Sequence, residues 1–157
     1  MTADDAADVA IKPPLLFLGA LALGCLMSLI VPLGPRLASP NGNALAVGLT
    51  FIAFGFVLAG MSARALRRAG TEIVPGRPAS ALVTTGPYRI TRNPIYIGLT
   101  LVYFGLSIVM TSLWVLLLLI PTLMILQHGI VMPEEAYLKR RFGAPYRKYQ
   151  AHVPRWL

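Results

Sequence analysis

One short stretch of the chain brings together several residue types that suit ligand binding. This stretch, RITRNPIYIG at residues 89–98, stands between two long apolar runs. Pro94 disfavours a helical conformation for the residue before it, so the sequence predicts that a helix begins here with the Asn93 amide as its cap. A helix N-terminus attracts anions, and Arg92 can hold a carboxylate through two hydrogen bonds. The stretch therefore predicts a seat for an anionic group of a ligand.

The same residues also have simpler interpretations. Arg89 and Arg92 could serve only as cationic anchors at a membrane boundary, and Tyr96 could be an aromatic residue of the membrane interface. Gly98, four residues after Pro94, would let either a ligand or a neighbouring helix approach closely. A plain boundary loop, however, needs the arginines at most and not the residues that follow them.

A pair of adjacent carboxylates lies further along the chain. Glu134 and Glu135 are the only acidic residues after Glu72. Neighbouring positions on a helix point about 100° apart, so one carboxylate can face a ligand while the other pairs with a nearby arginine. Carboxylates accept hydrogen bonds from hydroxyl and ammonium groups. The alternative is that both glutamates only stabilise the dipole of a helix that begins at Pro133.

The composition indicates a membrane protein with a single domain over residues 1–157. Hydrophobic residues make up 56% of the 157 residues and charged residues only 13%, which is too apolar for an ordinary soluble domain. The formal net charge is +8, but the cations lie in two clusters that flank apolar runs, so no nucleic-acid partner is expected. His128, His152 and Cys25 are the only histidines and cysteine, so no metal site is expected either.

The apolar runs predict an all-α, integral membrane helical bundle with about four transmembrane helices. Three long stretches lack charged residues, and the last of them extends over residues 93–133. About 20 residues cross a membrane, so this stretch should hold two helices with a turn near MTSLW at residues 110–114. The predicted helices are 14–33, 43–64, 94–110 and 112–131, with a mobile tail at 1–12 and a cytoplasmic loop at 65–93.

The cations set the expected orientation. Six Lys or Arg residues lie from the last residue of the second helix to the start of the third and six after the fourth, whereas the first hairpin loop has only Arg36. The positive-inside rule then makes both termini cytoplasmic in a multi-pass protein of an inner or cytoplasmic membrane. The tail at 133–157 should form amphipathic helices that lie on the lipid headgroups, with a stop at Gly143 and a second helix from Pro145. Its apolar stripe comprises Leu138, Phe142, Tyr146 and Tyr149.

Two segments taken together resemble a known group of membrane enzymes. LVTTGPYRITRNPIYIG at residues 82–98, followed by PEEAYLKRRFGAPYRKYQAHVPRW at 133–156, resembles the isoprenylcysteine carboxyl methyltransferase and phospholipid methyltransferase superfamily. The resemblance covers about the C-terminal half of the chain. The matching positions are Gly86, Tyr88, Arg92, Pro94, Tyr96, Gly98, Glu134, Glu135, Leu138, Phe142, Gly143, Tyr146 and Tyr149.

The two branches of this superfamily share the sequence features unequally. Asn93 stands where the isoprenylcysteine branch usually has histidine, and Asn-Pro-x-Tyr-x-Gly is more similar to phospholipid amine methyltransferases. The Glu134-Glu135 pair looks more like the isoprenylcysteine branch. The resemblance therefore leaves the methyl acceptor open.

The resemblance implies an enzyme that uses S-adenosylmethionine, bound on the cytoplasmic side by the C-terminal half. The acceptor would be lipophilic and enter from the membrane lipid: an isoprenylcysteine carboxylate, a phospholipid amine or a small thiol. Arg147 or Arg155 could hold an anionic acceptor, while the catalytic residues and the oligomeric state stay open. The implied cofactor-binding residues are Tyr88, Arg92, Asn93, Pro94, Tyr96, Gly98, Glu134 and Glu135.

Two other functions compete with this one. A small membrane transporter usually keeps an ionisable residue within a membrane helix, and the apolar interiors of the four predicted spans carry no Asp, Glu, Lys or Arg. A non-catalytic membrane factor that retains the fold would be favoured if the protein did not bind S-adenosylmethionine.

Overall fold

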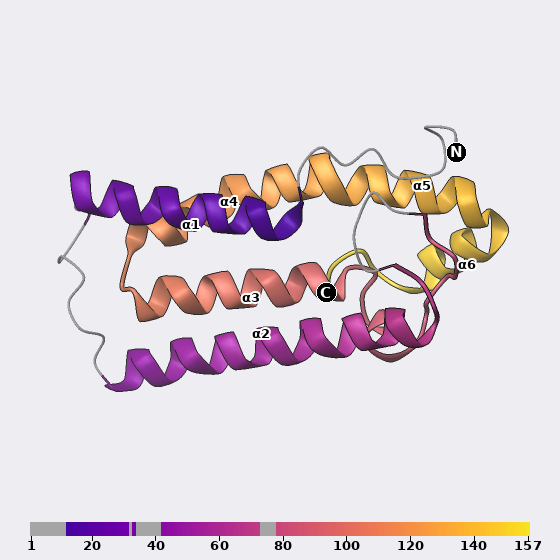
Figure 1. Cartoon of the computed structure of the whole chain (residues 1–157), viewed down its shortest axis with the longest axis horizontal. Coiled ribbons are helices and arrows are strands. Elements are labelled where there is room, and N and C mark those ends of the chain that lie inside the picture. The colour runs from indigo at the N-terminus through magenta and orange to yellow at the C-terminus, as the bar shows by residue number, and fades with distance from the viewer. Residues whose placement is uncertain (1–11, 32, 34–41, 73–77) are drawn as a thin grey trace.

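The computed structural model describes residues 12–31, 33, 42–72 and 78–157, and every regular element within these ranges is helical. Four long helices run alternately in opposite directions (Figure 1). They are α1 (Pro13–Ile30), α2 (Gly42–Arg68), α3 (Pro94–Val109) and α4 (Leu113–Leu126). The predicted all-α bundle is confirmed. The tail predicted at residues 1–12 lies, except for Lys12, outside the described residues.

The turn between α3 and α4 lies where the sequence predicts it. Thr111 has a φ of 46° in this turn, and the hydroxyl of Ser112 accepts a hydrogen bond from the backbone N–H of Val115 at 3.2 Å. Ser112 therefore caps α4. In contrast, α2 runs to Arg68, beyond its predicted end at residue 64, because its last turn holds good helix formers and cations that suit a helix C-terminus.

The fourth helix does not end near residue 131 as predicted. It continues through a π-helical turn at Gln127–Val131 into α5 (Met132–Phe142) (Figure 1). The backbone N–H of Met132 donates to the carbonyl of Gln127, which is the wider spacing of a π-helix. Pro133 has no N–H, and its ring crowds the carbonyl four residues before it. The wider turn relieves this crowding, so the proline does not start a separate helix.

The end of α5 and the start of α6 (Ala144–His152) follow the prediction. Gly143 separates the two helices with a φ of 57°, a conformation that glycine adopts without strain. The apolar stripe of the tail, however, packs within the protein: Tyr146, Tyr149 and Val153 form a buried cluster. Leu82, Leu138 and Phe142 pack against this cluster. The stripe thus attaches the tail to the bundle and is not available to lipid headgroups.

Glycines allow α2 and α3 to pack at very short distance. A methyl carbon added to Gly98 would lie 2.7 Å from the carbonyl oxygen of Gly55, and one added to Gly105 would lie 2.5 Å from that of Gly48. No side chain fits into these gaps, so the two backbones touch. Gly98 therefore lets a neighbouring helix approach, which was one of the two roles expected for it.

The lengths and surfaces of the helices suit a lipid bilayer. Within the described residues, α1, α2 and the continuous helix Leu113–Phe142 are long and apolar enough to cross a membrane. The apolar helix α3 has 16 residues, or about 24 Å, against a hydrocarbon core of about 30 Å. Large apolar side chains such as Leu29, Phe54 and Ile120 are exposed on the bundle. Lipid accommodates such a surface better than water, and the chain is a membrane protein.

Candidate functional site

Residues from the starts of α1 and α3, from the end of α2 and from α5 line one cavity. Its volume is about 520 Å³, and its walls are mainly apolar with a few polar side chains. Most of the residues expected to bind a cofactor gather around it although they come from distant parts of the sequence. Those that line the cavity are Tyr88, Arg92, Asn93, Pro94, Tyr96, Glu134 and Glu135.

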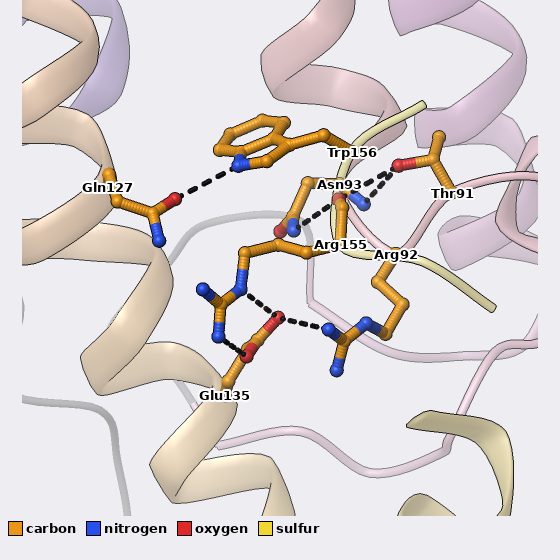
Figure 2. Close-up of polar contacts among 7 residues, drawn as sticks. All are labelled: Thr91, Arg92, Asn93, Gln127, Glu135, Arg155 and Trp156. Atoms are coloured by element: carbon orange, nitrogen blue, oxygen red, sulfur yellow. Dashed lines mark hydrogen bonds and ion pairs between the residues drawn. The ribbon is translucent and has the colours of Figure 1, made fainter. Parts of the chain in front are cut away.

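Glu135 is the centre of a buried ion-pair cluster (Figure 2). The Arg155 guanidinium donates two hydrogen bonds to its carboxylate, from Nε to Oε1 at 3.0 Å and from Nη2 to Oε2 at 2.8 Å. Arg92 Nη2 lies 3.3 Å from the same Oε1. The Glu135 side chain is only 8% exposed. The paired hydrogen bonds to this carboxylate raise the pKa of the Arg155 guanidinium. One glutamate of the pair thus contacts arginines, as the helical spacing predicts.

Arg92 keeps most of its donor capacity free. Its side chain is 9% exposed, and its Nε and Nη1 atoms are buried without a hydrogen-bond partner among the described residues. Most buried polar groups in proteins have a partner, and leaving one unpaired costs about 1–3 kcal/mol. Because Arg92 also lines the cavity, these nitrogens indicate a position for an anionic ligand group.

Glu134 and Tyr96 form a second polar contact in the cavity wall. The Tyr96 hydroxyl donates a hydrogen bond of 2.7 Å to Glu134 Oε2. Tyr96 is 6% exposed and belongs to the main hydrophobic core, so it is not an aromatic residue of the membrane interface. Glu134 makes no ion pair with the arginines that hold Glu135. The two adjacent carboxylates therefore have different partners.

Asn93 does not cap α3 as predicted. It stands at the N-cap position, but its side chain accepts no hydrogen bond from the helix. Instead, its Nδ2 donates to the carbonyl oxygen of Arg155 at 3.0 Å (Figure 2). The amide thus has its partner in the tail of the chain and leaves the N–H groups of the first turn of α3 uncapped.

Three tyrosines close the cavity on the side of α6. Burial raises the pKa of Tyr88 and Tyr149, and the Tyr149 hydroxyl donates to the Tyr88 carbonyl at 2.7 Å. Burial also raises the pKa of Tyr146 to about 12; the Glu135 carboxylate adds to this effect and the Arg92 cation opposes it. All three phenols therefore stay neutral at physiological pH and can act only as hydrogen-bonding, uncharged walls.

Other predicted residues lie away from the cavity. Gly98 faces α2, and Arg147 is exposed on α6. Arg155 contacts Glu135 behind the cavity wall and does not line the cavity itself. Neither arginine lines the first cavity, and the role of either one in holding an acceptor stays a prediction.

Sequence reasoning missed the contacts that the last residues of the chain make. The carbonyl of Arg155 accepts hydrogen bonds from Thr91 Oγ1 and from Asn93, each at 3.0 Å. Trp156 Nε1 donates to Gln127 Oε1 at 3.0 Å (Figure 2). Backbone carbonyls carry no signal of residue type, so only the match of the tail to the superfamily pattern pointed to this region.

A second cavity, also of about 520 Å³, opens on the outer side of α3 and α4. Apolar side chains from both helices line it, and Gln127 and His128 of the π-helical turn contribute polar atoms. Trp156 also lines this cavity.

A scan against protein-family models matches residues 43–145 to the phospholipid methyltransferase model. The chain belongs to the phospholipid methyltransferase family. The match includes α2, α3, α4 and α5, and thereby most of the cavity walls. No curated protein matches the chain in a direct sequence search.

Membership of the family identifies the protein in general terms as a membrane methyltransferase. It agrees with the resemblance drawn from residues 82–98 and 133–156, and it disfavours a transporter. Among the described residues, no group of three His, Cys, Asp or Glu side chains could hold a metal ion.

Proposed function

We propose that this family member transfers a methyl group from S-adenosylmethionine to a lipophilic acceptor, with the donor bound in the cavity beside Arg92. The observation that carries the proposal is the buried guanidinium, whose Nε and Nη1 atoms have no partner in the described part of the chain. A bound carboxylate would accept hydrogen bonds from these two nitrogens, and S-adenosylmethionine carries a carboxylate.

The residues around the cavity fit the other groups of the donor as well. Glu134 would accept hydrogen bonds from the ammonium group or from the ribose hydroxyls of the donor. The Tyr96 hydroxyl holds the Glu134 carboxylate in place through a hydrogen bond of 2.7 Å. A volume of about 520 Å³ is within the range of roughly 300–1,000 Å³ that is usual for small-molecule sites. Neutral tyrosines and apolar side chains would surround the adenosine.

The protein's part in the reaction would be positioning and the exclusion of water. S-adenosylmethionine supplies a methyl group on a sulfonium sulfur that leaves as a neutral thioether. The cavity residues need to hold the donor and acceptor in line, and the mainly apolar walls keep water away. A carboxylate or thiolate acceptor needs no base, whereas a protonated amine must first lose its proton.

The second cavity supports a lipophilic acceptor. It is lined mainly by apolar side chains of α3 and α4, and α3 also contributes Tyr96 to the first cavity. An acyl or isoprenoid chain would pack there without desolvating polar groups. The acceptor would thus reach the donor from the membrane lipid.

We further propose four membrane crossings with both termini in the cytoplasm. The charge distribution supports this orientation, because the cavity end of the bundle carries the basic residues after α2 and on α5 and α6. In a Cys25→Ala background, Asn43→Cys should react with an impermeant thiol reagent from outside intact cells, and Ala69→Cys should not. The reverse pattern would overturn the orientation.

The activity can be tested with purified protein in lipid nanodiscs and methyl-labelled S-adenosylmethionine. Three acceptor classes would be offered separately: a phospholipid with a primary amine, an isoprenylated cysteine and a small thiol. We expect label in at least one lipophilic product by mass spectrometry. If no class is labelled and S-adenosylhomocysteine does not bind, the protein is a non-catalytic member of its family.

A further inference from the structure

The last residues of the chain join two walls of the first cavity. The carbonyl oxygen of Pro154 accepts the backbone N–H of Arg92 at 3.0 Å. The carbonyl of Arg155, one residue later, accepts from the side chains of Thr91 and Asn93. The tail thereby holds the segment that leads into α3, and this segment carries Arg92 (Figure 2).

Side chains of the same tail hold the opposite wall. Arg155 forms the two-bond fork with Glu135 of α5, and Trp156 bonds Gln127 of the π-helical turn. Residues 154–156 therefore tie the start of α3 to the helix that carries Glu134 and Glu135. Removing this connection would free both walls to move relative to each other.

The charges in this cluster are shared unequally. Arg155 contacts Glu135 through two hydrogen bonds of 2.8 and 3.0 Å, whereas Arg92 has a single contact at 3.3 Å. A bidentate pair is stronger than one longer contact. Glu135 is thus directed mainly at Arg155, and its one contact with Arg92 leaves two nitrogens of that guanidinium, Nε and Nη1, without a partner among the described residues.

We propose that Arg155 is a positioning residue that limits the Glu135 carboxylate to one contact with Arg92 and so keeps the Nε and Nη1 atoms of Arg92 free for the anionic group of the donor. This inference rests on the proposed function, because it needs a donor carboxylate at Arg92. Without Arg155, the Glu135 side chain would turn to Arg92, form further hydrogen bonds to its free nitrogens, and compete with the ligand for them.

The proposal predicts an unusual rescue. Arg155→Gln should weaken binding of S-adenosylhomocysteine about tenfold, within the usual range of couplings between residues of one ion-pair network. Adding Glu135→Gln to Arg155→Gln removes the competing carboxylate and should restore affinity to within about threefold of the parent protein. Arg155→Lys keeps one charged contact and should lie between the parent and Arg155→Gln.

Isothermal titration of the purified full-length variants with S-adenosylhomocysteine tests this, with thermal unfolding of each variant as a check on folding. Arg140→Gln is the matched control, because it removes one positive charge as Arg155→Gln does, but at a position that is exposed on α5. If Arg155→Gln does not fold in detergent, Arg155→Lys with and without Glu135→Gln gives the same comparison.

The outcomes separate the two proposals. If the parent protein does not bind S-adenosylhomocysteine, the proposed function fails, and this inference fails with it. If the parent binds but Arg155→Gln binds equally well, only the role of Arg155 is wrong. If the double variant binds as weakly as Arg155→Gln or more weakly, Arg155 merely anchors the tail, and the competition between Glu135 and the ligand is refuted.

Discussion

The contact between α2 and α3 and the cavity end of the bundle are held together by different physical means. The contact between α2 and α3 depends on residues without side chains, because Gly55 and Gly98 let the two backbones touch. The cavity end depends on a few buried polar side chains, of which Arg92 and Glu135 are the centre. The first region is complete in itself, whereas the second still has unpaired donors. This difference agrees with the proposal that the cavity end binds the donor, while the helix contact supports the bundle.

The largest effect on stability is expected at the helix contact. Gly98→Leu would drive a side chain into the carbonyl of Gly55, since even a methyl carbon would lie 2.7 Å from it. Overpacking of this kind costs about 1–3 kcal/mol and can cost more when a backbone is the obstacle. We expect a clear fall in the melting temperature of the detergent-solubilised protein, measured by its intrinsic fluorescence.

Gly60→Leu is the matched control for this substitution. Gly60 is also in a helix, α2, but a methyl carbon there would have no atom within 4 Å. Replacing glycine by leucine in an open helical position should leave the melting temperature unchanged or raise it slightly. Equal destabilisation by both substitutions would show that the glycine contact does not support the bundle.

The two adjacent glutamates separate ligand binding from the internal ion pair. Glu134→Gln keeps the size of the side chain and removes the charge offered to the donor, so we expect S-adenosylhomocysteine to bind about tenfold more weakly or worse, as a lost charge-assisted hydrogen bond of about 1.5–3 kcal/mol implies. Glu135→Gln should have a smaller effect on affinity, since Glu135 contacts arginines. Parent-like binding by both variants would leave the pair with only its internal contacts, those of Glu134 with Tyr96 and of Glu135 with the arginines.

Much of the bundle could be predicted from the sequence because local patterns determine it. The long apolar runs predict α1 to α4, and the turn before Ser112 and the break at Gly143 come from short-range signals. The continuity of α4 into α5 could not be predicted in this way. Pro133 suggests a helix start, and only the π-helical turn before it explains why the helix persists.

The site was predictable in its residue types but not in its connections. The motifs identify Arg92, Asn93 and Glu135, and the structure gathers them at one cavity. The role of Asn93 as a helix cap was wrong because its amide meets a backbone carbonyl of Arg155, far along the chain. Such a contact depends on how α6 folds back onto the bundle, and no periodicity or spacing in the sequence encodes it.

The smallest effect is expected from the hydroxyl that orients Glu134. Tyr96→Phe removes one hydrogen bond of 2.7 Å and keeps the aromatic ring in the core. Tyr96 orients Glu134 and does not itself bind the donor in this account, so S-adenosylhomocysteine affinity should fall only about threefold, at the low end of couplings within one hydrogen-bond network. A loss as large as that of Glu134→Gln would show that Tyr96 itself contacts the ligand.

The most direct test of the account is the affinity of Arg92→Gln for S-adenosylhomocysteine, measured by isothermal titration beside the parent and Arg140→Gln. Arg155 still pairs with Glu135 in this variant, so no buried carboxylate is left alone and the protein should fold. The account predicts one binding site in the parent and in Arg140→Gln, and at least about tenfold weaker binding in Arg92→Gln, as expected when hydrogen bonds to a charged group are lost. Binding by Arg92→Gln that equals the parent's would contradict the claim that the free nitrogens of Arg92 mark the donor site.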